Sequence, residues 1–528
     1  MSLPRFLDRI VDATAPALDG LDRAAVTSKL ESTSISLVAG EKADVGTARE
    51  GFLLAANLLA RLYPSIAILA PDELARAAEA EITLINPVAE VTTTPPESQT
   101  AALLFEPGEA RIPVDTPAVA VFARGWNVYV DDPPSEGEPV AGPAALLAAV
   151  LGVSEVFRIV FADELGERGR RGRQPSALNL ITLSEPEQVE VPDDVDIGEA
   201  RLVGSGAIGQ AAALALAVAG ARGTLLAVDH EKVALSNLQR YVLARDSDVG
   251  EVKVDLLRER LAGSGLEVVP VPAEWHVGLV EAQLPTLVAL DSAEARIGVQ
   301  ASLPGPLYNA WTQPADVGWS RHEHFGETPC LACLYWPTDA RPNRHEQIAE
   351  AFRQHPLRVL GYLVHRLPVG LPLPPGGIPS LPAMPAPPEA DEWLARPIAD
   401  DIATAAGIDA SELAAWRDRS LADVYQDGIC GGALLHLNVG EAPREVLVPL
   451  AHQSVFAGVM LATQLIVAAV PGLKERRSTS IEGRYNVLAG LPQVMPRPRN
   501  RAESCICGDA VFRDVYGVRF GVESGEVA

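Results

Sequence analysis

The sequence predicts an α/β protein with a mostly parallel sheet, preceded by a second α/β domain. A strand–turn–helix–strand pattern runs from Ala200 to Asp229, and a further apolar strand stops at Asp291. Another strand–helix–strand pattern spans residues 35–70, without a phosphate-binding glycine pattern in its turn. Strands that alternate with helices are typical of parallel sheets, because the helices provide the crossover connections.

The N-terminal region contains several elements typical of an α/β domain. Its first long helix should end at Tyr63, because Pro64 is a stop signal. The expected elements are a strand at residues 35–40, a helix at 50–63, strands at 65–70, 117–123 and 126–131, and a helix at 143–151.

A glycine-rich turn follows the strand at residues 200–203. Gly204, Gly206 and Gly209 permit a tight turn and let a nucleotide phosphate approach the start of the next helix, where free N–H groups favour anions. Asp229 then stands where a ribose hydroxyl would be bound. These features indicate a nucleotide, and NAD, FAD and ATP fit them equally. The remaining central elements are expected at residues 210–220, 223–228 and 286–290.

The residues after Asp229 favour phosphoryl chemistry over hydride transfer. Asn237, Arg240 and Lys253 follow in quick succession, and nicotinamide enzymes have no need of such a set. A triphosphate does need it, because its charge must be held and the departing pyrophosphate neutralised. Asp291, at the carboxyl end of a buried strand, stands where a magnesium ligand is expected.

This set of residues, Asp229 to Asp291, resembles the ubiquitin-activating E1 superfamily, also called the ThiF/MoeB family. The resemblance is specific over residues 200–340 and looser over 426–510. It implies a Rossmann-like domain that adenylates the C-terminal carboxylate of a ubiquitin-like or sulfur-carrier protein, with an E2-like or sulfur-transfer protein as a further partner. It also implies ATP and Mg²⁺, with Asp229 on the ribose, Asn237, Arg240 and Lys253 on the phosphates, and Asp291 on Mg²⁺.

In that family an arginine from a partner half completes the ATP site. Arg49 and Arg61 are candidates for this arginine by location only. If the first 160 residues are a degenerate copy of the same fold, the chain contains both halves of the family's dimer, as an internal pseudo-dimer in place of a homodimer. The alternative is an unrelated domain that recognises the substrate.

Two close cysteine pairs predict a structural zinc site. Cys330 and Cys333 form a knuckle that offers two thiolates to the metal. The family carries such a pair here, joined by a second pair near the C-terminus. In this chain the second pair is Cys505 and Cys507, one residue tighter than the usual spacing. The alternative is four reduced thiols packed near one another.

Cys430 is the remaining cysteine and lies among glycines. The insertion before it resembles the place where E1-like proteins carry their thioester cysteine. A thiol there is able to take the activated acyl group from AMP. The alternative is a small buried apolar residue.

Composition shifts divide the chain. Residues 367–388 are dense in proline and glycine, which excludes regular helix and central strand. Residues 164–174 are basic and predict a solvated loop or a site for phosphate or an acidic partner. The expected divisions are an N-terminal α/β domain at 1–190, an ATP-binding domain at 191–338, a helical and proline-rich insertion at 339–425, and the remainder of the adenylation domain at 426–528.

Charge and composition exclude several classes of function. A formal net charge of −26 disfavours nucleic acid and anionic membrane as partners, and the 5% aromatic content disfavours base stacking. The start of the chain lacks the apolar run of a secretory signal, and the apolar residues 456–470 predict a buried helix. A cytoplasmic protein is expected.

The sequence therefore predicts an ATP-dependent adenylating enzyme, with thioester formation on Cys430 as a second step. One alternative is adenylation of a peptide or another small carboxylate by the same fold. The other is a non-catalytic E1-like module that binds a partner.

Overall fold

A computed structural model provides the structure of the chain. It describes residues 23–521 and a few isolated earlier ones, apart from 95–97, 109–111, 113–114, 135–141, 166–175, 193, 281–282, 314–316, 337–343, 379–387, 389, 407–413, 415, 430–448, 487–500 and 503. Cys430 and most of the basic segment 164–174 thus lie outside the described residues. The chain forms two compact units, one made of Met1–Trp336 with Pro449–Ala528 and the other of Pro337–Val448.

The first unit contains two seven-stranded sheets. In the first sheet the order is β3-β2-β1-β4-β5-β6-β7, with the five strands β3 to β5 parallel and β6 and β7 antiparallel to their neighbours. Its strands are β1 Ser34–Ala39, β2 Ser65–Leu69, β3 Glu90–Thr92, β4 Ala101–Phe105, β5 Ala118–Arg124, β6 Asn127–Val130 and β7 Ser176–Asn179.

The second sheet repeats this order as β10-β9-β8-β11-β12-β13-β14, again with only its last two strands antiparallel to their neighbours. The predicted α/β class, with a mostly parallel sheet and a second α/β region before it, is confirmed. Its strands are β8 Val195–Val203, β9 Ala221–Val228, β10 Leu266–Val271, β11 Thr286–Val288, β12 Leu307–Thr312, β13 Val317–His322 and β14 Glu482–Tyr485.

Helices also occupy matching places in the two halves. α3 and α7 follow the first strand of each sheet, α4 and α8 follow the second, and α5 and α17 connect the last two strands. Their bounds are α3 Gly46–Ala60, α4 Asp72–Ile85, α5 Ala144–Val160, α7 Ala207–Val218, α8 Lys253–Arg260 and α17 Ala451–Ala469. The other helices that the structure describes in this unit are α2 Arg23–Glu31, α9 Ala293–Ala301, α10 Leu331–Tyr335, α18 Leu473–Arg476 and α19 Ala510–Phe520.

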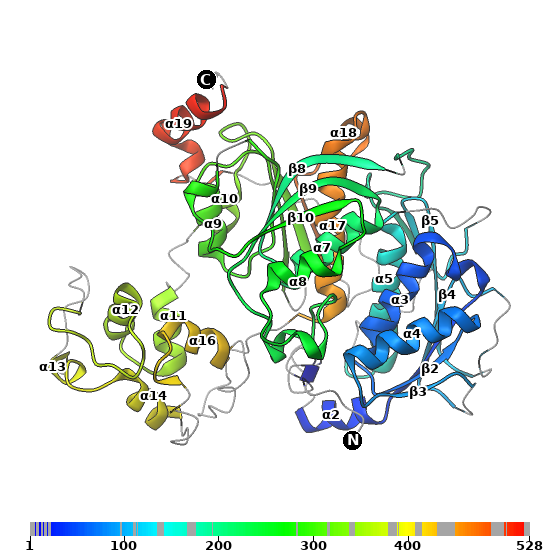
Figure 1. Ribbon diagram of the computed structural model, residues 1–528, viewed down its shortest axis with the longest axis horizontal. Helices are drawn as coiled ribbons and strands as arrows, with labels where there is room; N and C mark the ends of the chain where they lie inside the picture. The colour runs from blue at the N-terminus through cyan, green and yellow to red at the C-terminus, as the bar shows by residue number, and fades with distance from the viewer. Residues whose placement is uncertain are drawn as a thin grey trace. The chain divides into compact units, whose positions relative to one another are not determined.

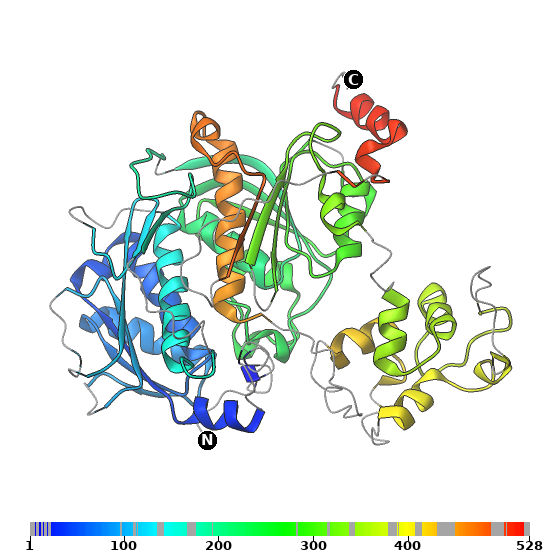
Figure 2. The ribbon, with the colours of Figure 1, turned by 180° about the vertical axis from the view of Figure 1, so that it is seen from behind.

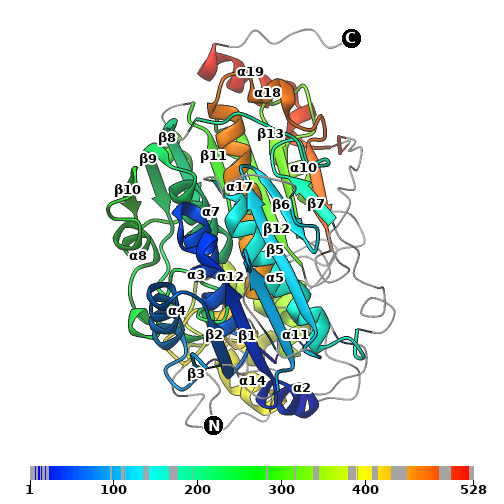
Figure 3. The same ribbon diagram turned by 90° about the vertical axis from the view of Figure 1, so that its right-hand side faces the viewer.

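Four of these helices pack between the two sheets. α3 packs on α5, α7 packs on α17, and α5 packs on α17 (Figures 1 and 2). The approach of α17 to α7 depends on Gly458, since a Cβ there would lie 2.5 Å from the Cβ of Ala211. The four buried helices therefore join the halves through one continuous apolar layer (Figure 3).

α17 is long and apolar enough by length and composition to cross a membrane. However, 94% of its most apolar window is buried inside the structure. The prediction of a buried helix at residues 456–470 is therefore confirmed, although α17 begins five residues earlier, at Ala451.

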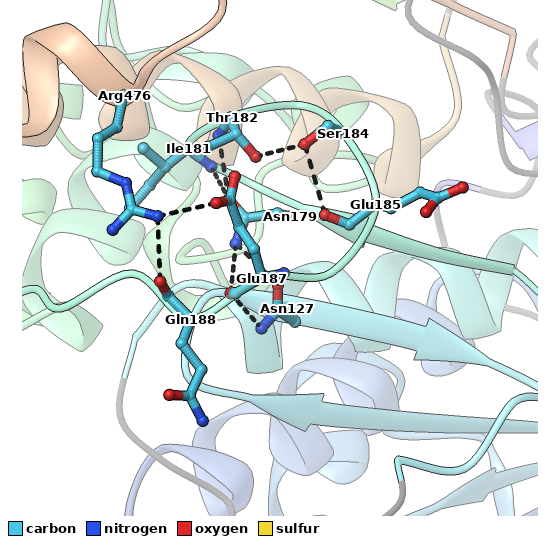
Figure 4. Close-up of polar contacts among 9 residues, drawn as sticks. All are labelled: Asn127, Asn179, Ile181, Thr182, Ser184, Glu185, Glu187, Gln188 and Arg476. Carbon is cyan, nitrogen blue, oxygen red and sulfur yellow. Dashed lines mark hydrogen bonds and ion pairs between the residues drawn. The ribbon is translucent and has the colours of Figure 1, made fainter.

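The segment that joins the two sheets is held near its middle, at Glu187 and Gln188, by side chains (Figure 4). The amide nitrogen of Asn127 donates to the carbonyl of Glu187 at 3.0 Å, and that of Asn179 donates to the side-chain oxygen of Asn127 at 2.7 Å. Arg476 of α18 binds the carboxylate of Glu187 at 2.8 Å and the carbonyl of Gln188 at 3.2 Å. These contacts fix the course of the segment before β8 begins.

The second unit is helical around its own apolar core. Its helices are α11 Arg344–Phe352, α12 Pro356–His365, α13 Ala390–Trp393, α14 Ile398–Ala406 and α16 Leu421–Ile429. α11 and α12 are separate helices, because Arg353 adopts a left-handed φ of 52° just after α11 and His355 caps α12. The domain boundaries expected from composition remain predictions.

Candidate functional site

The glycine-rich turn after β8 is shaped by close backbone contacts. Gly204 has a φ of 95°, and a Cβ there would lie 2.6 Å from the carbonyl oxygen of Ala289. A Cβ on Gly209 would lie 2.0 Å from the carbonyl oxygen of Gly204. Both positions therefore require glycine. Gly206 caps α7, so the first N–H groups of that helix lie at the turn.

Asp229 lies beside this turn. It follows β9 directly, and the pairing of Val203 with Val228 places the ends of β8 and β9 at the same level. Its carboxylate accepts hydrogen bonds of 2.8 Å from the backbone N–H groups of Ser205 and Glu231. The acid is thus fixed by the backbone of the turn that it faces.

The segment Leu235–Ala244, called here the 235–244 loop, carries two more of the predicted residues. The side-chain oxygen of Asn237 accepts from the N–H of Ala234 at 2.9 Å, which closes the first turn of the loop. Arg240 is half-buried, and within the described part of the chain its side chain has no hydrogen-bond or ion-pair partner. Tyr241 is buried, with its hydroxyl near Gly206.

Lys253 is the first residue of α8 and is only 3% exposed. Its amine forms an ion pair with Glu231 and lies 5.2 Å from the ring centroid of Tyr241. Burial acts to lower the pKa of Lys253, but the neighbouring Tyr241, Asp229 and Glu231 outweigh it and raise that pKa above its ordinary value. The site therefore holds a buried positive charge next to Asp229.

Asp291 lies at the same edge of the sheet. It follows β11, and the pairing of Val288 with Val203 places the end of β11 level with that of β8. Its side chain is exposed, and the next residue, Ser292, caps α9. The carboxyl ends of three adjacent strands thus bring together Gly204, Asp229 and Asp291, an edge where ligands of open α/β sheets bind.

The two arginines considered for the partner-half role differ in their contacts. Arg49 forms an ion pair with Asp44, inside its own half. Arg61 is fully buried and donates to the carbonyl oxygens of Leu238 and Ala244 in the 235–244 loop. The guanidinium of Arg61 is thus engaged by the loop backbone.

Two residues of this site, Glu231 and Tyr241, were not predicted from the sequence. Glu231, the ion-pair partner of Lys253, follows Asp229 by two positions, and Tyr241 follows Arg240 directly. The only signal for either was its nearness to a residue already singled out.

Among its described residues, the matching edge of the first sheet lacks these features. Gly40 follows β1 as Gly204 follows β8, and its Cβ would likewise meet a carbonyl oxygen, that of Glu106, at 2.8 Å. The next residues form a 3₁₀ helix, Glu41–Asp44, that places two acids after Gly40. Ala70 follows β2 where Asp229 follows β9. This edge therefore offers neither the ribose acid nor a glycine turn leading directly into a helix.

The four paired cysteines form one cluster. Their sulfurs lie within 4.8 Å of one another, with distances of 3.5 Å for Cys330–Cys505, 3.5 Å for Cys333–Cys507 and 4.0 Å for Cys330–Cys333. Tetrahedral zinc with bonds of about 2.3 Å separates its sulfurs by about 3.8 Å, so the donor set fits zinc.

The tight spacing of the second pair does not prevent this arrangement. Cys505 caps the 3₁₀ helix Ile506–Gly508, and that turn brings the sulfur of Cys505 within 4.8 Å of the sulfur of Cys507. His322 is buried, and its ring nitrogens contact the hydroxyl of Ser320 and the carbonyl oxygen of Pro329, whereas His324 is exposed.

Comparison with known proteins places these features in a family. The sequence model of the ThiF family matches residues 195–507. A protein of Sinorhizobium fredii (strain NBRC 101917 / NGR234), named uncharacterized protein y4jF, is 32% identical over 541 residues, which cover 99% of this chain and 98% of that protein.

Two named adenylyltransferases are similar over shorter stretches. The molybdopterin-synthase adenylyltransferase of Escherichia coli (strain K12) is 39% identical over 88 residues, 17% of this chain and 34% of that protein. The adenylyltransferase and sulfurtransferase uba4 of Aspergillus terreus is 39% identical over 97 residues, 18% of this chain and 20% of that protein.

Among solved structures, E. coli MccB with AMPCPP and MccA matches at 19% identity and a TM-score of 0.24, over 30% of this chain and 48% of that one. The family match spans more than half of the chain and includes both the glycine turn and the cysteine cluster. The chain belongs to the ThiF family.

Proposed function

We propose that the protein is an ATP-dependent adenylyltransferase that acts on the C-terminal carboxylate of a ubiquitin-like or sulfur-carrier protein. One observation carries the proposal: Asp229, Lys253 and the 235–244 loop converge beside the glycine turn at the carboxyl edge of β8, β9 and β11. Membership of the ThiF family and similarity to two adenylyltransferases support it.

In this proposal each residue has a part in placing the nucleotide. Asp229 binds the ribose, the first N–H groups of α7 face the phosphates, and Asn237, Arg240 and Lys253 neutralise them. Asp291 would hold Mg²⁺, which supplies further positive charge to the leaving pyrophosphate. Because Lys253 is paired with Glu231, its amine must exchange that carboxylate for a phosphate when ATP enters.

The reaction then needs alignment more than side-chain chemistry. A carboxylate oxygen attacks the α-phosphorus, the new O–P bond forms, and the bond from that phosphorus to the β-phosphate oxygen breaks. The products are an acyl-adenylate and pyrophosphate. In the second step a thiolate at Cys430 attacks the acyl carbon, forms a thioester and expels AMP.

We also propose that the chain carries both halves of the family's dimer. The two sheets share one strand order and one pattern of directions, and α3 and α5 take the places of α7 and α17. The first half lacks the ribose acid, since Ala70 stands at that point. This supports an inactive first half over an unrelated substrate-recognition domain.

The cysteine cluster is proposed to bind a structural zinc ion through Cys330, Cys333, Cys505 and Cys507. The location is proposed to be cytoplasmic, where reduced thiols of this kind persist. Adenylation of a peptide or another small carboxylate is the second candidate function, since the same nucleotide edge serves it. A non-catalytic binding module is the third.

The first prediction concerns Lys253. Lys253→Met should reduce ATP–pyrophosphate exchange with a suitable carrier protein by about 100-fold, because the buried charge on the phosphates is lost. Lys232→Met, at an exposed lysine nearby, is the matched control and should keep the wild-type rate. If no carrier, peptide or small carboxylate supports exchange by the wild type, and ATP does not bind, the enzyme proposal is wrong.

The second prediction concerns the metal. Protein purified without chelator should contain about one zinc per chain, because the four sulfurs fit one tetrahedral ion. Cys505→Ser should lower the zinc content and the midpoint of thermal unfolding, whereas Cys430→Ser should change neither. A folded, zinc-free wild type would exclude the structural zinc.

The third prediction concerns Cys430. Cys430→Ala should abolish the reducible adduct with the carrier protein on denaturing gels while leaving pyrophosphate exchange intact, since adenylation precedes the thiol step. An unchanged adduct would remove Cys430 from the mechanism.

A further inference from the structure

We propose that Arg61, which lies just after the end of α3 in the first half, is a positioning residue for the nucleotide site in the second half. It fixes the 235–244 loop, so that Arg240 is presented to the ATP phosphates. This inference rests on the proposed adenylation function and extends it to the role of the first half.

Arg61 spans the part of the loop that carries Arg240. Its Nη1 donates to the carbonyl oxygen of Leu238, and its Nη2 donates to that of Ala244 at 3.2 Å. Its Nε donates to the side-chain oxygen of Asn57 at 2.9 Å, one turn earlier on α3. The two loop carbonyls bracket Arg240, so one guanidinium sets both ends of this segment.

Asn57 adds a third anchor between them. Its amide nitrogen donates to the carbonyl oxygen of Val242 at 2.9 Å and to the carboxylate of Glu81 at 2.7 Å. Glu81, on α4, also lies 3.7 Å from the guanidinium of Arg245, just beyond the loop. Four contacts of this set cross from the first half to the loop or to Arg245 just after it, and the contacts of Asn57 with Arg61 and Glu81 connect them within the first half.

The second half holds the loop from its other side. The side-chain oxygen of Gln210 on α7 accepts from the N–H of Leu243 at 3.2 Å, and the amide of Gln239 donates to the carbonyl of Pro449 at 3.2 Å. Tyr241 is buried against Gly206. Asn237 and Arg240 stay partly exposed, and Arg240, the one charged side chain of the loop, has no partner among the described residues.

A charged residue at the fully buried position 61 calls for an explanation. Burial lowers the pKa of Arg61 to about 10, with Glu81 partly opposing this, so the side chain stays charged at neutral pH. A fully buried cation that contacts neutral carbonyls is costly, and an apolar side chain would fill the same space without that cost. In exchange, the guanidinium holds two loop carbonyls, those of Leu238 and Ala244, and its Nε holds Asn57, which binds a third, that of Val242.

Fixing the loop matters because phosphate chemistry is sensitive to position. A displacement of about 1 Å in a group that contacts the substrate lowers a rate by up to about 100-fold. The first half thereby contributes to ATP binding through the loop backbone, without requiring a nucleotide site of its own.

The test compares Arg61→Met with Arg321→Met in the full-length chain. Arg321 is a matched buried arginine, with a pKa that burial likewise lowers to about 10, and it binds Gln464 and the carbonyl of Ser478 away from the loop. The KM for ATP in pyrophosphate exchange should rise about tenfold in Arg61→Met and stay unchanged in Arg321→Met. If a variant merely contains less folded protein, its apparent kcat falls because fewer molecules are active, and its KM for ATP does not change.

A double-mutant cycle with Arg240→Ala provides the second readout. If Arg61 acts through Arg240, Arg61→Met should add little in the Arg240→Ala background, because the group that it positions is gone. Independent, multiplicative effects on kcat/KM, or an unchanged KM in Arg61→Met, would overturn the positioning role. A wild type without exchange activity would instead reject the proposed function, so the two failures are distinguishable.

Discussion

The packing of α7 against α17 is the contact on which the rest of the first unit depends. Gly458 allows the two helices to approach closely, and α17 in turn packs on α5 of the first half. The four central helices therefore fix one half against the other. Only with this layer in place can α3 reach the 235–244 loop, through Arg61 and Asn57.

The two halves share a strand order but differ at the carboxyl ends of their parallel strands, the edge where Gly204 and Asp229 lie in the second half. In the second half the turn after β8 leads directly into α7, and Asp229 faces it. In the first half a 3₁₀ helix with two acids follows Gly40, and Ala70 replaces the acid. Of these two acids, Glu41 is exposed and Asp44 pairs with Arg49, so the described residues at this edge offer neither the glycine turn nor the acid that the second half has.

Much of the nucleotide edge could be predicted from local sequence. The residues Gly204, Asp229 and Asp291 each follow an apolar strand, and parallel strands bring such positions together at one edge. The contacts of Arg61 could not be predicted in the same way, because it lies 177 positions before Leu238 and meets it only through tertiary packing. Nor could spacing alone decide whether Cys505 and Cys507 fit one cluster, since that depends on the turn between them.

The most direct test of this account is the stoichiometry of ATP binding, measured by isothermal titration calorimetry with MgATP. One MgATP site per chain is expected, lost in Asp229→Ala and retained in a variant of the first half, Glu41→Ala. Two sites per chain would contradict the proposal that the first half is inactive, and no binding at all would contradict the nucleotide site proposed at the edge of β8, β9 and β11.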